Sequence, residues 1–123
     1  MLVTMMLLAM APNPTVLDAP RKAYSVCIKG FETKSLAAKM DPAAYATALK
    51  GQCSAEADSL ARALTSYDVA MGGKRATAAA SAASDVADYR LTSEERFRDL
   101  TPSAPAMATA TPAPPVTVAS APK

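Results

Sequence analysis

Residues 27–53, CIKGFETKSLAAKMDPAAYATALKGQC, begin and end with the only two cysteines of the chain and contain a marked helix start at Asp41-Pro42. An aspartate side chain accepts hydrogen bonds from the free amides of a first helical turn, and proline is favoured at the first helical position. Cys27 and Cys53 are equally distant from the residue before this start. If two helices meet there as an antiparallel hairpin, the two cysteines lie opposite each other on neighbouring helices. The stretch therefore predicts a Cys27–Cys53 disulfide.

The central part of the chain has the composition of a helical protein. No proline lies between Pro42 and Pro102, and alanine, leucine, lysine and glutamate fill much of this interval without alternation of apolar and polar residues. This pattern predicts helices and argues against a turn-rich β domain. The predicted fold is all-α: an antiparallel helical hairpin joined by the disulfide, extended to a three-helix up-down-up bundle plus a short fourth helix. The expected boundaries are a leader over 1–19, a helical domain over 20–100 and a tail over 101–123.

Apolar residues recur at helical spacing in the first two predicted helices, over 21–40 and 42–71. Gly51 is expected to bend or break the second helix, and Gly72-Gly73 to end it. Glu32 falls off the first apolar stripe and is expected on the polar side. The first stripe comprises Tyr24, Cys27, Ile28, Phe31 and Ala38. The second comprises Tyr45, Leu49, Cys53, Ala57, Leu60, Leu64, Tyr67 and Met71. Both cysteines therefore belong to apolar faces that are expected to meet.

The alanine-rich segment 74–90 predicts a third helix with a slim apolar face. Small side chains let helix backbones approach closely but bury little area each. The residues assigned to this face are Ala79, Ala82 or Ala83, Val86 and Tyr89. Ala79, Ala83 and Val86 also form a candidate face for a protein partner, and the alternative is that they pack entirely within the bundle.

The segment after the third helix carries a signal for a separate helix start. Thr92-Ser93-Glu94-Glu95 matches a capping box, in which the threonine and Glu95 satisfy each other's backbone amides. We therefore expect a short last helix that ends near Leu100, with Phe97 and Leu100 as its apolar anchors.

The two ends of the chain differ from the middle. Residues 1–11, MLVTMMLLAMA, are uncharged and too short to span a bilayer, but they suit the apolar core of an export signal. Ala9-Met10-Ala11 offers the small-x-small pattern of a cleavage site. The lack of a preceding lysine or arginine and the position of Pro12 count against this, so an ordinary buried or frayed N-terminal segment remains the alternative. Disulfides persist in oxidising compartments. Together the two features predict a periplasmic or secreted protein.

The tail over 101–123 is rich in proline, alanine, serine and threonine, and Lys123 is its one charged residue. Such a tract is expected to be disordered and extended, with a reach of about 70 Å. It is either a spacer or a tail without a function of its own.

The composition argues against most kinds of chemistry. Histidine is absent, the net charge is +2, and the aromatic residues are few, which excludes a nucleic-acid footprint and a histidine-based metal or catalytic site. The cysteines lie too far apart in sequence for a redox motif, although free thiols in a cytosolic protein remain an alternative. The carboxylates are expected on the surface, and Asp68 is the acid that we would test first. We expect no cofactor, no metal and no enzyme activity.

The function expected from these observations is that of a non-enzymatic exported helical protein with an interaction or structural role. The alternative is an accessory subunit that docks into a larger envelope assembly through its alanine-rich third helix. The leader, the cysteine pair, the run Cys53-Ser54-Ala55-Glu56-Ala57 and the Pro/Ala tail resemble small exported helical proteins of unassigned function from alphaproteobacteria. The resemblance covers about 24–90. It implies a compartment and a helical fold, and it assigns no functional residue.

Overall fold

The computed structural model describes residues 11–102, so most of the expected leader and tail lie outside the described residues. Within 11–102 every regular element is a helix. These elements are the 3-10 helix η1 (Pro14–Leu17) and the α-helices α1 (Asp18–Ala37), α2 (Pro42–Leu49), α3 (Ser54–Ala70) and α4 (Arg75–Leu100). Helical structure thus begins ahead of the boundary expected at residue 20, and the side chain of Leu17 in η1 is buried.

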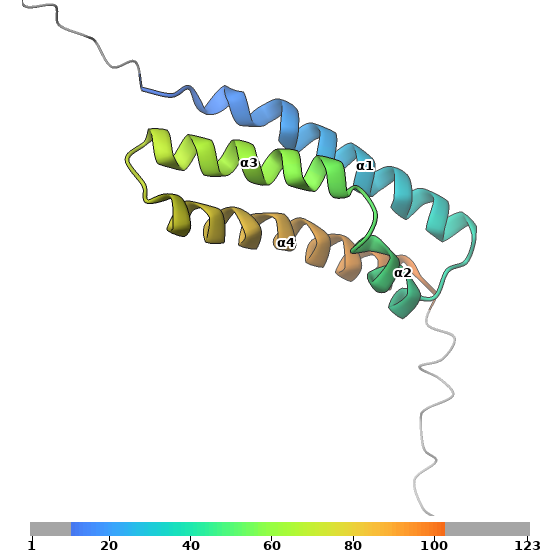
Figure 1. Ribbon diagram of the computed structural model, residues 1–123. Coiled ribbons are helices and arrows are strands. Elements are labelled where there is room, and N and C mark those ends of the chain that lie inside the picture. Colours follow the sequence, from blue (N-terminus) through green and yellow to red (C-terminus); the bar gives the residue numbers. More distant parts are fainter. Residues whose placement is uncertain (1–10, 103–123) are drawn as a thin grey trace, which may run out of the picture.

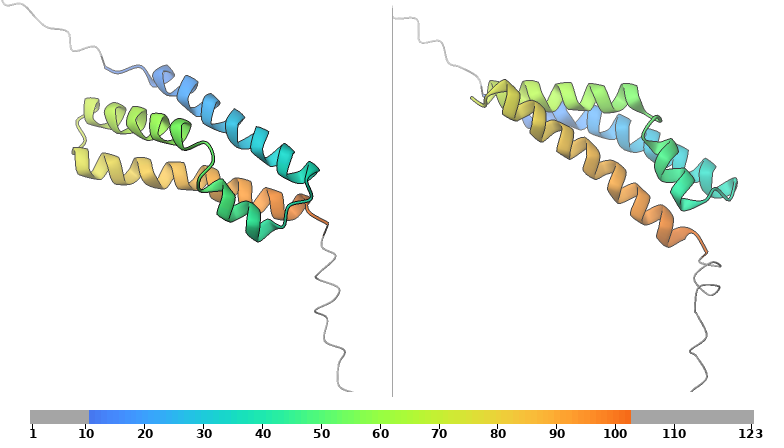
Figure 2. Two further views of the ribbon diagram at one scale, coloured as in Figure 1. Left: turned by 45° about the vertical axis from the view of Figure 1, so that its right-hand side comes forward. Right: turned by 60° about the horizontal axis from the view of Figure 1, so that its bottom comes forward.

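The three long helices α1, α3 and α4 lie side by side in an up-down-up bundle (Figure 1). The short helix α2 packs against the second half of α4 at one end of the bundle, as the two further views also show (Figure 2). The predicted all-α fold and the disulfide across antiparallel helices are confirmed. Four α-helices are present within residues 11–102, but the short one is the second of them and not the last.

The predicted helix start at Asp41 and Pro42 is confirmed. The Asp41 carboxylate accepts hydrogen bonds from the backbone amides of Ala43 at 3.0 Å and Ala44 at 3.3 Å. Asp41 itself has an extended backbone conformation, and Pro42 occupies the first turn of α2. The cap therefore satisfies donors that would otherwise have no partner at this helix end.

The second predicted helix is broken at the glycine. It ends at Leu49, turns through Gly51, and resumes at Ser54 after Cys53, which has a left-handed backbone with φ of 58°. Glycine disfavours a helix interior by about 1 kcal/mol, and the break lets α2 turn onto α4 while Cys53 stays beside Cys27. The apolar stripe nevertheless continues across the break, with Tyr45, Leu49, Cys53, Leu60 and Leu64 all buried. Met71 was expected on this stripe, but it lies past the end of α3 and is exposed.

The predicted boundary at Thr92 is wrong, because α4 runs without interruption from Arg75 to Leu100. No glycine or proline lies within this stretch, and a continuous helix keeps every backbone bond that a new start would break. The Ser93 hydroxyl bonds to side chains of other helices. Phe97 is buried as expected, whereas Leu100, the second expected anchor, is 55 % exposed.

The buried face of α4 agrees with the expected face at Ala82 and Val86 and differs at one position, where Ala78 is buried in place of Ala79. Ala78, Ala82 and Val86 are buried, whereas Ala79 and Ala83 are exposed. Because α4 is continuous, its buried residues form one row along the helix. Starting from Phe97 and Ser93, this row continues toward the N-terminus at helical spacings of three and four residues. Of the candidate partner face, Ala79 and Ala83 therefore lie on the surface and Val86 lies in the core.

A stack of three aromatic rings joins α1, α2 and α4. The ring of Tyr45 lies 3.9 Å from that of Phe97 and 5.3 Å from that of Phe31, measured between centroids, and both pairs are stacked. Tyr45 and Phe97 are almost fully buried. This cluster holds α2 against the bundle. Ala38 was expected on the same face of the first helix as Phe31, but it lies beyond the end of α1 and is exposed.

Gly30 lies in the exposed interior of α1, where a methyl group would meet no atom within 4 Å. We expect Gly30→Ala to raise the free energy of unfolding by roughly 0.5–1 kcal/mol, because alanine loses less backbone entropy on folding. Urea unfolding measures this change. Gly73→Ala is the matched control, and it should instead lower the free energy of unfolding, since its methyl group would lie 2.9 Å from the Asp68 carbonyl oxygen. A destabilised Gly30→Ala protein would contradict the described course of α1.

Candidate functional site

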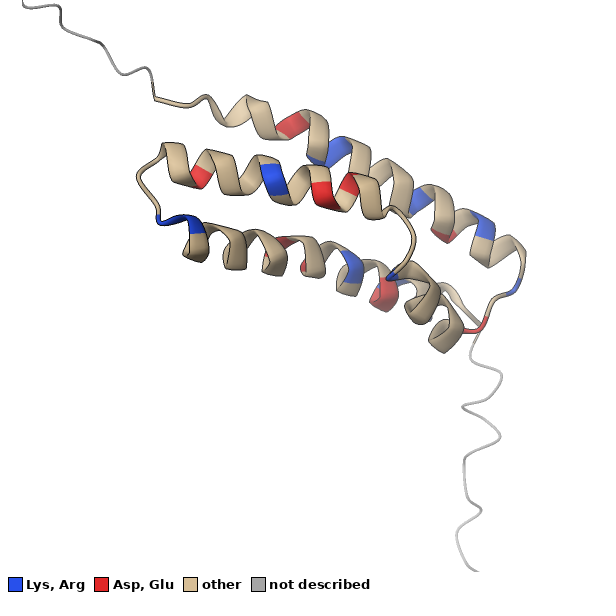
Figure 3. Cartoon of the chain, in the orientation of Figure 1, with Lys and Arg blue, Asp and Glu red and all other residues tan. Residues whose placement is uncertain are grey.

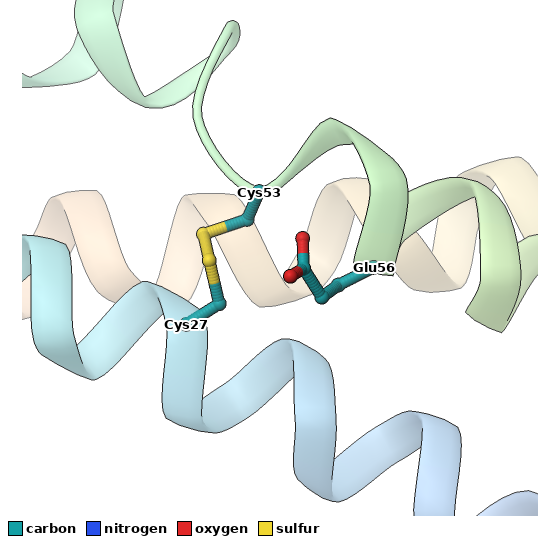
Figure 4. A group of neighbouring side chains, drawn as sticks. All are labelled: Cys27, Cys53 and Glu56. Atoms are coloured by element: carbon teal, nitrogen blue, oxygen red, sulfur yellow. A yellow bond between two sulfur atoms is a disulfide. The ribbon is translucent and has the colours of Figure 1, made fainter.

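The disulfide lies where the middle of α1 meets the start of α3. The α-carbons of Cys27 and Cys53 are 5.9 Å apart, within the range of unstrained disulfides. Cys53 is buried and Cys27 is half-buried. Glu56, in the first turn of α3, directs its carboxylate toward the two sulfurs (Figure 4). One carboxylate oxygen and both sulfur atoms lie within 4.8 Å of one another.

A second cluster, which we call the Glu32 network, comprises Glu32, Tyr45, Ser93 and Arg96. Arg96 Nε donates to Glu32 Oε1 at 2.9 Å and Nη2 donates to Oε2 at 2.6 Å. The Ser93 hydroxyl donates to Glu32 Oε2 at 3.0 Å. Its oxygen lies 2.7 Å from the Tyr45 hydroxyl, and because the Ser93 proton is already used, Tyr45 donates to Ser93. A chain of hydrogen bonds thus runs from α2 through α4 to α1.

The pKa values of Glu32 and Tyr45 are shifted in opposite directions. The hydrogen bond from Arg96 holds the pKa of Glu32 below its ordinary value of 4.5, against the opposing effect of burial. Burial raises the pKa of Tyr45 above 10.0. Glu32 is therefore charged and Tyr45 neutral at neutral pH. In the part of the chain that the structure covers, Glu32 and Arg96 form the one ion pair.

The sequence interpretation missed this network because it placed Glu32 on the polar side of the first helix. The buried row of α1 actually passes from Tyr24 through Ile28 to Glu32 and Ser35. Glu32 follows Ile28 by four residues, and this helical spacing is a sequence signal that Glu32 shares the buried face. A charged residue at such a position is nevertheless normally expected to be exposed to solvent. Ser93 was likewise assigned to a cap that does not form.

The Glu32 network predicts a loss of stability in acid. Because the pKa of Glu32 is lower in the folded protein than in the unfolded chain, the unfolded state takes up a proton first as the pH falls. The stabilisation is therefore complete above the ordinary pKa of 4.5 and is lost as the pH falls through the folded-state value. Urea unfolding from about pH 7 to about pH 3 measures this dependence.

Glu32→Gln should lose less stability than the wild type as the pH falls, since the variant has no carboxylate to titrate at this position. Glu95→Gln is the matched control, because Glu95 is an exposed glutamate of the same helix as Arg96. If wild type and Glu32→Gln lose stability in parallel below the ordinary glutamate pKa, the network does not contribute as described.

A groove of about 590 Å³ lies between α1 and α4 and is floored in part by Leu64 of α3. Cations from α1 face carboxylates from α4 across it. Its charged lining residues are Arg21, Lys29, Arg96, Asp85 and Asp88, and its other lining residues are Ser25, Ile28, Leu64, Tyr89 and Thr92. Asp85 and Asp88 are exposed to solvent. Asp68, the acid singled out from the sequence, is half-buried near the end of α3 and does not line this groove.

Comparisons of the chain with protein-family models, with curated proteins and with solved structures gave no match. Across residues 11–102, no helix combines the length and the apolar character that a membrane crossing requires.

Proposed function

We propose that this chain is a non-enzymatic, exported helical protein with an interaction or structural role. The observation that carries the proposal is the Cys27–Cys53 disulfide, which joins helices far apart in sequence at an unstrained separation of 5.9 Å. A bond of this kind persists in the periplasm or outside the cell and is reduced in most cytosols. Such a bond contributes a large share of the stability of a small domain, because the hydrophobic core of the domain is limited.

Two features of the described residues fit an interaction or structural role. Charged residues of both signs are interspersed along α1, α3 and α4 (Figure 3). The buried charged residue Glu32 is bound to three partner groups and holds helices together. Its hydrogen-bond capacity is used within the fold, so it is positioned as a structural group and not as an acid or base facing a substrate.

The experiment that tests this proposal is fractionation of the native host, followed by N-terminal sequencing of the protein. We expect the protein in the extracytoplasmic fraction, with a cleavage point before Asn13. Asn13 accepts the hydrogen bond that caps η1, and the buried Leu17 of η1 packs in the core. A chain that remains in the cytosol would refute export. A mature chain that begins after Leu17 would show that η1 is not part of the domain.

A second candidate is an accessory subunit that docks through α4. The observation that favours it is the uncharged stretch 76–84 of α4 (Figure 3). Ala79 and Ala83, which belong to this stretch, are exposed. An alanine surface permits close approach of another backbone. Sedimentation at micromolar concentration tests this candidate by comparing wild type with Ala83→Lys and with Ser66→Lys, an exposed control on α3. A complex of defined stoichiometry that is lost only in Ala83→Lys supports docking, and a monomer throughout with no co-purifying partner contradicts it.

A further inference from the structure

Reduction of the disulfide would leave two thiols beside a carboxylate, a set of groups that binds borderline-soft metal ions. The sulfurs of Cys27 and Cys53 and a carboxylate oxygen of Glu56 all lie within 4.8 Å of one another. They come from different elements: α1, the residue before α3, and the first turn of α3. The Glu56 side chain is half-buried and has no ion-pair or hydrogen-bond partner within residues 11–102. A carboxylate in this position is free to act as a ligand.

We propose that the reduced form of this protein binds one Zn²⁺ ion through Cys27, Cys53 and Glu56. A dithiol reductant supplies two electrons and two protons, which cleave the disulfide to two thiols while the reductant becomes its own disulfide. Zn²⁺ then binds the two sulfurs as thiolates, and the two protons pass to solvent. Glu56 supplies the third ligand, and a water molecule completes the tetrahedron.

The backbone geometry suits such an ion without a rearrangement of the helices. Two thiolates on one zinc lie about 3.8 Å apart, given a Zn–S distance of about 2.3 Å and tetrahedral angles. The α-carbon separation of 5.9 Å allows this increase in sulfur separation by side-chain rotation. Thiolate ligands favour zinc over calcium or magnesium, which prefer sites made of oxygen.

The ion would replace the disulfide as the link between α1 and α3. Metal bound to the folded state shifts the unfolding equilibrium by mass action, so the melting temperature lost on reduction should be partly recovered when zinc is added. The sequence does not indicate this site because the cysteines are distant in the chain, and Glu56 joins them only after the break before α3. This inference concerns the reduced chain and is independent of the proposed exported role.

The test is a titration of the reduced full-length protein with ZnCl₂ against a chromophoric chelator, in the presence of a reductant that does not bind zinc. We expect one zinc per chain for wild type, no binding by the oxidised protein, and no binding by the Cys27→Ser/Cys53→Ser variant. Glu56→Gln should bind at least about tenfold more weakly, since even the loss of a group that only orients a metal ligand costs about 10–100-fold. Asp58→Asn, an exposed acid of the same helix, should bind as wild type does.

Melting of the same samples gives a second readout, because the Glu56→Gln protein keeps its disulfide when oxidised and can be shown to fold. Zinc should raise the melting temperature of the reduced wild type and raise it less in reduced Glu56→Gln. Equal zinc affinity in wild type and Glu56→Gln would overturn the three-ligand site. Binding by the double serine variant, or the absence of binding by reduced wild type, would overturn the proposal entirely.

Discussion

Phe97→Ala is expected to lower the free energy of unfolding by about 3–5 kcal/mol, the largest effect of any single apolar truncation in this fold. Phe97 is 1 % exposed, and its ring stacks on Tyr45 with centroids 3.9 Å apart. Truncation removes the ring against which α2 packs and leaves a cavity between α2 and α4. Because so small a domain has only several kcal/mol of net stability, the variant should be largely unfolded near its physiological temperature. Urea unfolding followed by circular dichroism measures the change.

Leu100→Ala is the matched control, because Leu100 lies one helical turn further along α4 and is 55 % exposed. Its truncation should cost less than about 0.5 kcal/mol, as for other surface positions. Similar losses in the two variants would contradict the continuous α4 and would favour a separate last helix with two buried anchors.

Loss of the disulfide is expected to have the second-largest effect. The bond closes a loop with a sequence separation of 26 residues, and the loop-entropy relation assigns such a closure about 3.5 kcal/mol. For a domain of this size, that loss corresponds to a fall in melting temperature of roughly 15–25 °C. The measurement compares oxidised wild type with reduced wild type and with Cys27→Ser/Cys53→Ser, all in a buffer that contains a metal chelator.

The chelator separates the effect of the bond from any effect of zinc. The reduced protein and the double serine variant should both melt well below the oxidised protein, because both lack the link. A fall of a few degrees or less would contradict this expectation and would mean that the bond does not restrict the unfolded chain as the loop-entropy relation requires.

The elements of the fold that could be predicted from sequence are those with strong local signals. Asp41-Pro42 marks the start of α2 through a cap and a fixed proline φ, and the structure shows both. The apolar stripes that contain Cys27 and Cys53 predicted the disulfide, because helical spacing determines which side chains share a face. These signals depend on a few neighbouring residues, so a single sequence is enough to read them.

The features that sequence analysis missed depend on competition between distant parts of the chain. Thr92 to Glu95 has the pattern of a cap, but Ser93 has better partners in Glu32 and Tyr45, and α4 continues through it. Glu32 was assigned to solvent because nothing near it in sequence shows that Arg96 will lie opposite. Gly51 was recognised as a place where the helix bends or breaks, and the packing of α2 on α4 decides that it breaks.

The central claim is that the Cys27–Cys53 bond exists in the protein as the cell makes it. The most direct measurement is alkylation of thiols during rapid acid lysis of the native host, followed by intact mass spectrometry of the purified chain. We predict no alkylated cysteine and a mass lower than that of the reduced chain by two hydrogen atoms. Two alkylated cysteines would contradict the account, because the bundle would then form without its link and the argument for an oxidising compartment would fail.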